Sequence, residues 1–328
     1  MRRRRSRLST AAVIAAVVVS LAGEAGAQRG SANEGAIFLL LPVGARAVGM
    51  GQAIVADRPG SEAVWWNPAA LARLEKVEAA IHHSQSVIGT GDAVAFVVPS
   101  SLLGVLAASI NMLDFGEQEV TDPEAGTTGR LLLRSFVYAA SYATTVGDHV
   151  SAGISYKVLQ FRVDCTGACP TLGNIAATTS AIDLGAQYDV DPWLPLTVGL
   201  AVRNLGPRLQ VNDREQSDRL PQRLQAGVLY RVAGIEDLSK DTELHLTGDV
   251  IGELDLRTPA GRLGADAIWR KRVHLRAGYA FDASDGSGPA VGLGIDTGSL
   301  VFDIARIFDG FSADAGQAPT YFSLRYLF

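Results

Sequence analysis

The side chains best suited to bind a metal ion are five histidines scattered along the chain. They are His82, His83, His149, His245 and His274, and no two are spaced as in the His-x-x-x-His pattern of metal sites. His82 and His83 are adjacent, so on a strand they would point to opposite faces and could not share one ion. The sequence therefore predicts structural histidines, at a membrane interface or facing a lumen, and no metal site.

The two cysteines, Cys165 and Cys169, lie close together in the segment Cys-Thr-Gly-Ala-Cys-Pro. A metal site would need further ligands, and no histidine is near in sequence. In an oxidising compartment such a pair forms a small loop disulfide by default. We therefore favour a disulfide over a metal site.

No arrangement of residues is typical of an enzyme. The chain has no Gly-x-Ser-x-Gly elbow and no phosphate-binding loop, and Gly292-Leu-Gly294 lies in a strand pattern without a following helix. Two carboxylates could act as an acid–base pair, but the acidic residues of the alternating segments are better explained as lumen-facing. These residues are Asp183, Asp189, Asp249 and Asp303. The sequence predicts no catalytic centre and no cofactor.

The first residues indicate the compartment. Met1 is followed by Arg2–Arg5 and Arg7, then by an apolar stretch over 11–22 and the small residues Ala25-Gly26-Ala27. This order is typical of a signal peptide, cleaved before Gln28. The alternative is a membrane anchor, but about a dozen apolar residues are too few to span a bilayer. We predict a signal peptide over 1–27, used for general secretion.

The composition favours a chain whose apolar residues are dispersed. Of 328 residues 48% are hydrophobic, and no segment after the signal peptide offers eighteen consecutive apolar residues for a membrane helix. A transmembrane barrel, in which every second residue faces lipid, has that distribution. The formal net charge of −5 gives nucleic-acid binding no electrostatic support.

From Val77 onward the dominant period is two. Ile182, Leu184, Ala186 and Tyr188, for example, alternate with polar or small residues, so each such segment has one apolar and one polar face. A soluble sandwich would show the same local pattern. The predicted strands lie near 77–84, 92–99, 104–115, 130–144, 149–162, 179–191, 195–204, 222–232, 243–251, 262–269, 273–281, 288–296, 299–306 and 321–328.

The connections separate a membrane barrel from a sandwich. Short turns are expected at 100–103, 145–148, 192–194, 270–272 and 297–298, and longer polar loops at 116–129, 163–178, 205–221, 252–261 and 307–320. Short turns at one end and long loops at the other are typical of outer-membrane barrels. The connection at 233–242 is longer than this pattern requires, and 85–91 and 282–287 are short for outer loops. The sequence therefore predicts an all-β, antiparallel barrel of about fourteen strands over 76–328.

The last strand supports this placement. Phe322, Leu324, Tyr326 and the terminal Phe328 share one face, as in the signal that the barrel-assembly machinery reads. In water such a strand would favour edge-to-edge aggregation, whereas lipid would cover it. The tryptophans Trp65, Trp66, Trp193 and Trp269 fall near element ends, which suits membrane-interface anchors, although Trp65 and Trp66 could instead pack inside the barrel.

The segment 28–75 differs from the rest, because it is rich in small residues and glycine. Asn67 and Pro68 have the residue types of a helix cap and first helical position. Glycines over 44–51 would let the backbone approach a barrel wall closely. We predict a plug inside the lumen. Its motif residues are Pro42, Gly44, Arg46, Gly49, Met50, Gly51, Trp66, Asn67, Pro68 and Ala69.

The run from Phe38 to Ala53, followed by Trp-Asn-Pro-Ala-Ala-Leu over 66–71, resembles the N-terminal signature of the PorV/PorQ family of FadL-like outer-membrane barrels. The segments 202–207, 220–230 and 275–279 also resemble internal motifs of that family. Gln52 stands where a glycine is common, and Arg58-Pro-Gly-Ser61 replaces an acidic, alanine-rich stretch. The resemblance implies a fourteen-stranded barrel with its N-terminal segment in the lumen.

Three functions are then compared. The PorV/PorQ resemblance implies a non-enzymatic accessory of protein secretion or surface attachment, with a secreted cargo protein bound by the long loops. The alternative is a FadL-like channel for hydrophobic small molecules, which requires an apolar pocket near 36–56 and a lateral opening. A soluble periplasmic propeller is disfavoured because repeats of about 40–50 residues are absent. The first is favoured slightly, in the outer membrane and in contact with its lipid.

Overall fold

The computed structural model describes residues 34–122, 126–169, 174–190, 194–210, 217–232, 241–254, 259–282, 286–310 and 316–328. The predicted signal peptide and Trp193 lie outside these residues. In the described part of the chain no helix has the length and apolar character needed to cross a bilayer.

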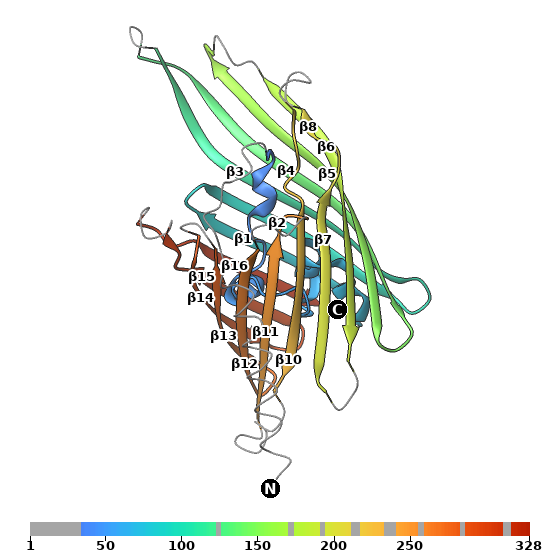
Figure 1. The fold of residues 1–328 in the computed structure, drawn as a ribbon. Helices are drawn as coiled ribbons and strands as arrows, with labels where there is room; N and C mark the ends of the chain where they lie inside the picture. The colour runs from blue at the N-terminus through green and yellow to red at the C-terminus, as the bar shows by residue number, and fades with distance from the viewer. Residues whose placement is uncertain are drawn as a thin grey trace.

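The strands form a closed antiparallel barrel of fourteen strands, in which β1 pairs with both β2 and β16 (Figure 1). This confirms the predicted fold class. The wall consists of β1 (Glu78–Ser86), β2 (Gly89–Ser100), β3 (Gly104–Asp122), β4 (Gly126–Val146), β5 (Val150–Gly167), β6 (Ile175–Asp189), β7 (Leu196–Leu205), β10 (Arg223–Arg231), β11 (Thr242–Gly252), β12 (Ala260–Trp269), β13 (Val273–Phe281), β14 (Gly288–Asp296), β15 (Leu300–Ile307) and β16 (Thr320–Leu327). A small hairpin of β8 (Leu209–Gln210) and β9 (Ser217–Asp218) lies in one connection.

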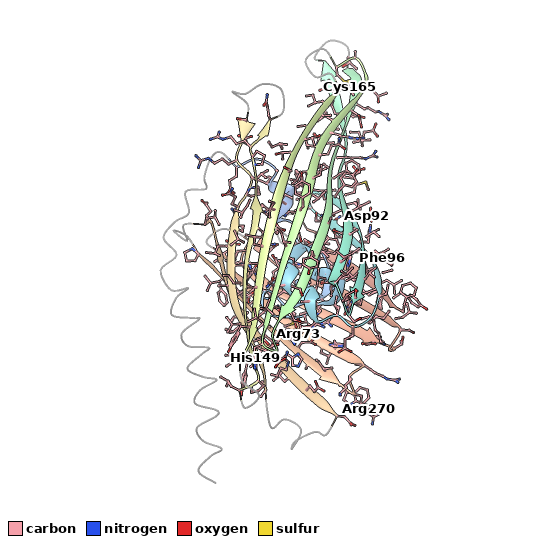
Figure 2. All side chains as sticks on the ribbon, turned by 90° about the vertical axis from the view of Figure 1, so that its right-hand side faces the viewer. Arg73, Asp92, Phe96, His149, Cys165 and Arg270 are labelled. Carbon is pink, nitrogen blue, oxygen red and sulfur yellow. A yellow bond between two sulfur atoms is a disulfide. The ribbon has the colours of Figure 1, made fainter. Side chains whose placement is uncertain are left out.

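The two ends of the barrel differ, and we call them the turn end and the loop end. The turn end carries the connections after β2, β4 and β12, and the loop end carries those after β3, β5 and β7. On the loop end β3 to β6 extend well beyond the other strands, with lengths of 19, 21, 18 and 15 residues (Figure 1). We call this extension of the four strands the ribbon. Figure 2 shows Cys165 at the tip of this ribbon and His149 at the turn end.

The predicted loops 116–129 and 163–178 were wrong, because most of their residues belong to the ribbon. Pairing of β3 with β4 continues to Asp122 and Gly126, past a bulge between Asp114 and Glu117. Above that bulge the exposed residues of β3 are polar or glycine, as at Glu117 and Glu119. The hydrophobic period therefore ends while the backbone hydrogen bonding of the strands continues.

Side chains alternate between the two faces of the wall as the sequence predicts. On β6 Asp183 and Gln187 are buried inside, whereas Leu184 and Tyr188 are 45% and 48% exposed outside. The same outward exposure of large apolar residues recurs around the wall. A continuous apolar exterior of this size is unusual in a water-soluble monomer but is satisfied by lipid.

The N-terminal segment lies within the barrel (Figure 1). It forms the short helices η1 (Ile37–Leu40), α2 (Ala45–Gly49), η2 (Gly60–Glu62), α3 (Ala63–Trp66) and η3 (Pro68–Arg73). Met50, Ile54 and Leu71 are among its fully buried side chains. The side chain of Asn67 caps η3 by accepting a hydrogen bond from the Ala69 backbone amide at 3.1 Å. We call residues 34–77 the plug segment.

Glycine permits close contact between the plug segment and the wall. A Cβ atom on Gly278 of β13 would lie 2.1 Å from the Gly51 backbone nitrogen, and Gly51 itself has φ of +61°. Gly49 and Gly292 face each other in the same way, because a Cβ on Gly49 would lie 3.0 Å from the Gly292 Cα. Side chains at these positions would force the plug segment away from the wall.

Candidate functional site: the barrel interior

One side of the interior is lined by a buried ionic network. Arg276 of β13 lies between two carboxylates, donating to Asp303 at 2.6 Å and to Asp266 at 3.3 Å. Arg325 of β16 donates to the other oxygen of Asp303 at 3.4 Å and lies 3.7 Å from Glu78. All five side chains are almost completely excluded from solvent. Each charge has an opposite partner, as burial of ions requires.

The plug segment joins this network through Arg46 of α2. Its guanidinium donates to Asp57 at 2.8 and 3.0 Å and lies 3.7 Å from Asp266. Burial alone would raise the pKa of Asp57, but the adjacent Arg46 charge outweighs it and holds that pKa below its usual value. We call Arg46, Asp57, Glu62, Glu78, Asp266, Arg276, Asp303 and Arg325 the ionic side of the interior.

Glu62 is the least compensated carboxyl of the ionic side. Burial raises the pKa of Glu62 to about 7, although the nearby Arg325 acts in the opposite direction. Its oxygens accept hydrogen bonds from the Ala47 backbone amide at 3.0 Å and from the Ser323 hydroxyl at 3.3 Å. Glu62 thus links η2 to both α2 and β16.

Two wall residues and Asn67 of the plug segment hold the backbone between Ile54 and Asp57. Asp249 of β11 accepts from the Ile54 and Val55 amides at 2.7 and 2.9 Å. Gln187 of β6 and Asn67 both donate to the Val55 carbonyl oxygen, at 3.0 and 2.6 Å. The plug segment from 45 to 73 is therefore fixed to opposite sides of the wall.

The acidic residues that the sequence places in the lumen do face the interior. Asp303 and Asp249 hold the plug segment or its arginine partners, and Asp189 pairs with Arg58 at the turn end. Asp183 accepts from Lys157 at 2.8 Å and from the Asn204 backbone amide at 2.7 Å, at an irregularity between β6 and β7. Each carboxylate has a structural partner, and no group of potential metal ligands occurs among the described residues.

The other side of the interior is apolar. Behind β3 to β6, near the loop end, Phe38 of the plug segment packs in a cluster with inward-facing wall residues. We call this the apolar side of the interior; its members are Ala36, Phe38, Leu113, Val137, Leu159, Ala177, Ala181, Leu209 and Leu220, with Leu39, Leu41, Phe115 and Phe161 at its margin. Lumens of water-filled barrels are polar, so this apolar lining differs from that of a water-filled barrel.

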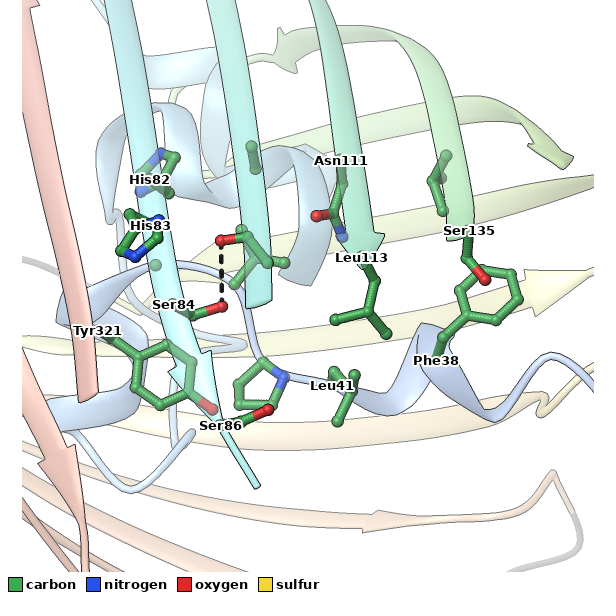
Figure 3. Close-up of a pocket in the computed structure, with 16 residues that line it drawn as sticks. Phe38, Leu41, His82, His83, Ser84, Ser86, Asn111, Leu113, Ser135 and Tyr321 are labelled. Carbon is green, nitrogen blue, oxygen red and sulfur yellow. Dashed lines mark hydrogen bonds between the residues drawn. The ribbon is translucent and has the colours of Figure 1, made fainter. Parts of the chain in front are cut away.

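A cavity separates the apolar side from β1 and β2 (Figure 3). Phe38 and Leu41 form one wall, Leu113 and Val137 face them, and Tyr321 of β16 closes the end. The cavity measures about 30 Å³, whereas a cavity that binds benzene measures roughly 150 Å³. A hydrophobic ligand would fit only after the side chains of residues 38–41 move.

Two further cavities continue from it. One, also of about 30 Å³, leads past Val43 to the Trp65 and Trp66 rings and to Arg203. Arg203 lies over the Trp66 ring at 5.1 Å and donates to the Trp65 carbonyl oxygen at 3.3 Å. The other, of about 330 Å³, opens beyond Trp66 and is lined by Arg223, Arg262, Glu253 and Asp282.

The motif residues of the plug segment divide between these regions. Arg46, Gly49, Met50 and Gly51 pack among β11 to β16, and Asn67, Pro68 and Ala69 approach Gly153 and Gly185 of β5 and β6. Pro42 and Gly44 line the first cavity, and the indole of Trp66 donates to the Val43 carbonyl oxygen at 2.9 Å. They are thus structural residues, close to the cavities.

Several residues that matter here were not singled out from the sequence. They are Arg276, Arg325, Glu62 and Glu78 of the ionic side and Leu113 and Val137 of the apolar side. The signal available was a charged or apolar residue at an inward position of an alternating strand. That signal does not reveal which inward residues meet, because register and strand order bring them together.

Most of the remaining predicted sites lie outside the lumen. A disulfide joins Cys165 and Cys169, with Cα atoms 6.4 Å apart, at the ribbon tip. Phe322, Leu324, Tyr326 and Phe328 are exposed on the outer face of β16. Trp269 is exposed at the turn end, whereas Trp66 is buried inside. His82 is buried and His83 exposed, so the two point to opposite faces.

Comparison with known proteins links the fold to hydrocarbon channels. No protein-family model matches the chain, and no curated protein matches its sequence. Among solved structures it is similar to the Pseudomonas putida toluene transporter TodX (TM-score 0.58, 11% identity, covering 87% of this chain and 98% of that one). It is also similar to the CymD monoaromatic hydrocarbon channel (0.55, 14%, 88% and 98%) and the Ralstonia pickettii toluene transporter TbuX (0.53, 13%, 87% and 98%). The likeness extends over almost the whole barrel and concerns the fold.

Proposed function

We propose that the chain is an outer-membrane channel that takes up small hydrophobic molecules. The observation that carries this proposal is the apolar side of the interior, formed by Phe38, Leu113, Val137 and Leu159 within a barrel. Such a lining is unfavourable in a channel for hydrated solutes, because water beside it would lose hydrogen bonds. An apolar solute gains about 25 cal/mol for each Å² it buries against it.

The cavities suggest the order of contacts along the route. The polar cavity beside Arg223 and Arg262 would be the vestibule reached from the loop end. The solute would then pass Trp66 and enter the apolar side between Phe38 and Val137. The ionic side blocks a path along the barrel axis, so the exit would lie in the side of the wall. It would be where β1 and β2 end, at a lower level than the ribbon.

The fold comparison supports this function over the secretion role. TodX, CymD and TbuX are named as transporters or channels for toluene or monoaromatic hydrocarbons. The secretion role rests on the PorV/PorQ resemblance alone, and cargo binding by the loops has no further observation in its favour. We therefore favour the hydrophobic-molecule channel over the secretion role.

Uptake of radiolabelled toluene by cells that lack their own hydrocarbon channel tests the proposal. Cells producing the chain should accumulate toluene faster than cells with an empty vector. Val137→Trp, which fills the cavity, should abolish the gain. Ala140→Trp is the matched control, because Ala140 lies on the outer face of the same strand. Equal uptake by all strains would refute the channel, and retention of one secreted protein by a tagged copy would restore the secretion role.

A further inference from the structure

Two arginines face each other on the outer wall near the loop end. Arg134 of β4 pairs directly with Arg162 of β5 in the antiparallel register. Both point outward, because their neighbours Ser135 and Val163 are buried inside. Like charges at directly opposite positions destabilise a sheet. An anion between the two guanidinium groups would remove that cost.

The pair lies where the apolar exterior ends. The outward apolar residues of β4 run from Val146 through Tyr142 and Tyr138 to Phe136. At about 3.3 Å per residue and a strand tilt of about 45°, this run covers roughly 24 Å along the barrel axis. The apolar band of a membrane barrel is about 25 Å tall. Arg134 and Arg162 therefore stand at headgroup level, beyond the hydrocarbon.

The guanidinium groups retain free donors. Arg134 uses its Nε to donate to Asp114 at 2.8 Å, which leaves its terminal nitrogens available. Arg162 has no carboxylate partner among the described residues and lies 5.6 Å from the Phe136 ring centroid. The next strand places only Ala176 opposite Arg162, so nothing bulky covers its other side.

We propose that Arg134 and Arg162 bind a phosphate of a phosphorylated glycolipid, of the lipopolysaccharide class, in the outer leaflet. The two guanidinium groups are carried by directly paired residues, and their terminal nitrogens are donors suited to the oxygens of a phosphate. Immediately below, the stacked Phe136 and Tyr138 rings, 6.2 Å apart, offer a flat surface to acyl chains. This combination favours a lipid over a free anion. The proposal requires the loop end to face outward but not the channel function.

Binding of bisphosphorylated lipid A to the purified barrel in nanodiscs, measured by native mass spectrometry, tests this site. The wild type should bind bisphosphorylated lipid A at least about tenfold more tightly than the dephosphorylated lipid, since each charge-assisted hydrogen bond contributes that order of affinity. The double variant Arg134→Gln/Arg162→Gln should lose this preference. Arg162→Gln alone should weaken it, and this variant breaks no ion pair between residues that the structure describes.

The matched control is Arg306→Gln. Arg306 of β15 is also exposed near the loop end and lies 5.9 Å from the Phe308 ring centroid, but it faces Thr320 and Val291, not a second arginine. It should leave lipid binding unchanged. The proposal is overturned if the wild type binds both lipids equally, if the double variant keeps the preference, or if millimolar inorganic phosphate displaces the lipid. Toluene uptake by the double variant should remain normal, so the two proposals can fail separately.

Discussion

The ionic and apolar sides of the interior hold the same plug segment in different ways. On the ionic side Arg46, Asp57 and Glu62 are tied by directional bonds to Asp266 and Ser323. On the apolar side residues 36–42 make no hydrogen bond to a wall strand within the described part of the chain, and Phe38 is held by packing alone. Packing is less directional than hydrogen bonding, so this stretch can shift without leaving a buried polar group unpaired.

The contrast assigns different tasks to the two sides. The ionic side keeps the plug segment in place, because any displacement would expose unpaired charges in a low-dielectric interior. The apolar side gives a hydrophobic solute a surface that can open. If one part of the plug segment is anchored by ion pairs and the other is held by packing alone, the barrel can admit a solute without releasing the plug segment.

The largest expected effect is on the ionic side. Asp303→Asn removes the carboxylate that compensates Arg276 and Arg325, leaving two buried cations short of a partner. Breaking a buried pair in this way costs about 3–5 kcal/mol. Urea unfolding, followed by the loss of the fast-migrating folded band on a gel without heating, would measure the free energy of unfolding.

The control for Asp303 is Asp92→Asn. Asp92 pairs with His83 on the outer face, where both side chains are about half exposed. An exposed pair contributes about 0.2–1 kcal/mol, so this change should be barely measurable. If the two variants were equally stable, the network would not anchor the plug segment.

On the apolar side we expect a loss of stability together with a gain of transport. Phe38→Ala removes a buried ring at the cavity and should lower the free energy of unfolding by about 3 kcal/mol. The enlarged cavity should also admit toluene faster than that of the wild type. Asp303→Asn should give no such gain, because the ionic side does not line this cavity. Slower uptake by Phe38→Ala would show that the ring is part of the route and not its gate.

The wall could be predicted from the sequence because a strand at a lipid surface has a strict period. Leu184, Tyr188 and their equivalents must face lipid, which gives strand positions and number. The predictions failed over 116–129 and 163–178. There the ribbon extends beyond the apolar band of the barrel, and neither face of its strands needs apolar residues. Strand pairing continues there through backbone bonds that leave no trace in hydrophobicity.

The interior was much less predictable. The alternation places Asp303 and Arg276 on the inner face, but their contact depends on the register of β13 to β15. The plug segment adds a second uncertainty, since Arg46 could have faced any of the inward carboxylates. The channel hypothesis required an apolar pocket near 36–56, but the wall residues that complete it were not identified, because inward Leu113 and Val137 resemble ordinary core residues until they are seen to share a cavity with Phe38.

A pH change should act on the ionic side through Glu62, with an intermediate effect. Burial raises the pKa of Glu62 to about 7 from its usual value of 4.5, so the folded protein binds a proton that the unfolded chain releases. This stabilisation is fully present below about pH 4.5 and is lost as the pH rises through 7. Between pH 5 and 8 the free energy of unfolding should fall by roughly 2–3 kcal/mol.

Glu62→Gln isolates this contribution, because glutamine does not titrate and can keep the hydrogen bond from the Ala47 amide. The free energy of unfolding of the variant should vary less with pH than that of the wild type, while its toluene uptake should match that of the wild type at each pH. An identical slope in both proteins would mean that other groups govern the response.

The smallest expected effect concerns the ribbon above the apolar side. The disulfide closes a short loop, which by chain entropy contributes at most about 2 kcal/mol. The ribbon tip lies beyond the apolar band of the barrel. Cys165→Ser/Cys169→Ser should therefore loosen the β5–β6 connection without changing the global unfolding midpoint. Limited proteolysis should therefore cleave the variant faster between β5 and β6 than the wild type. The wild type treated with dithiothreitol should match the variant, and a drop in the midpoint equal to that of Phe38→Ala would mean that the ribbon and the apolar side unfold as one unit.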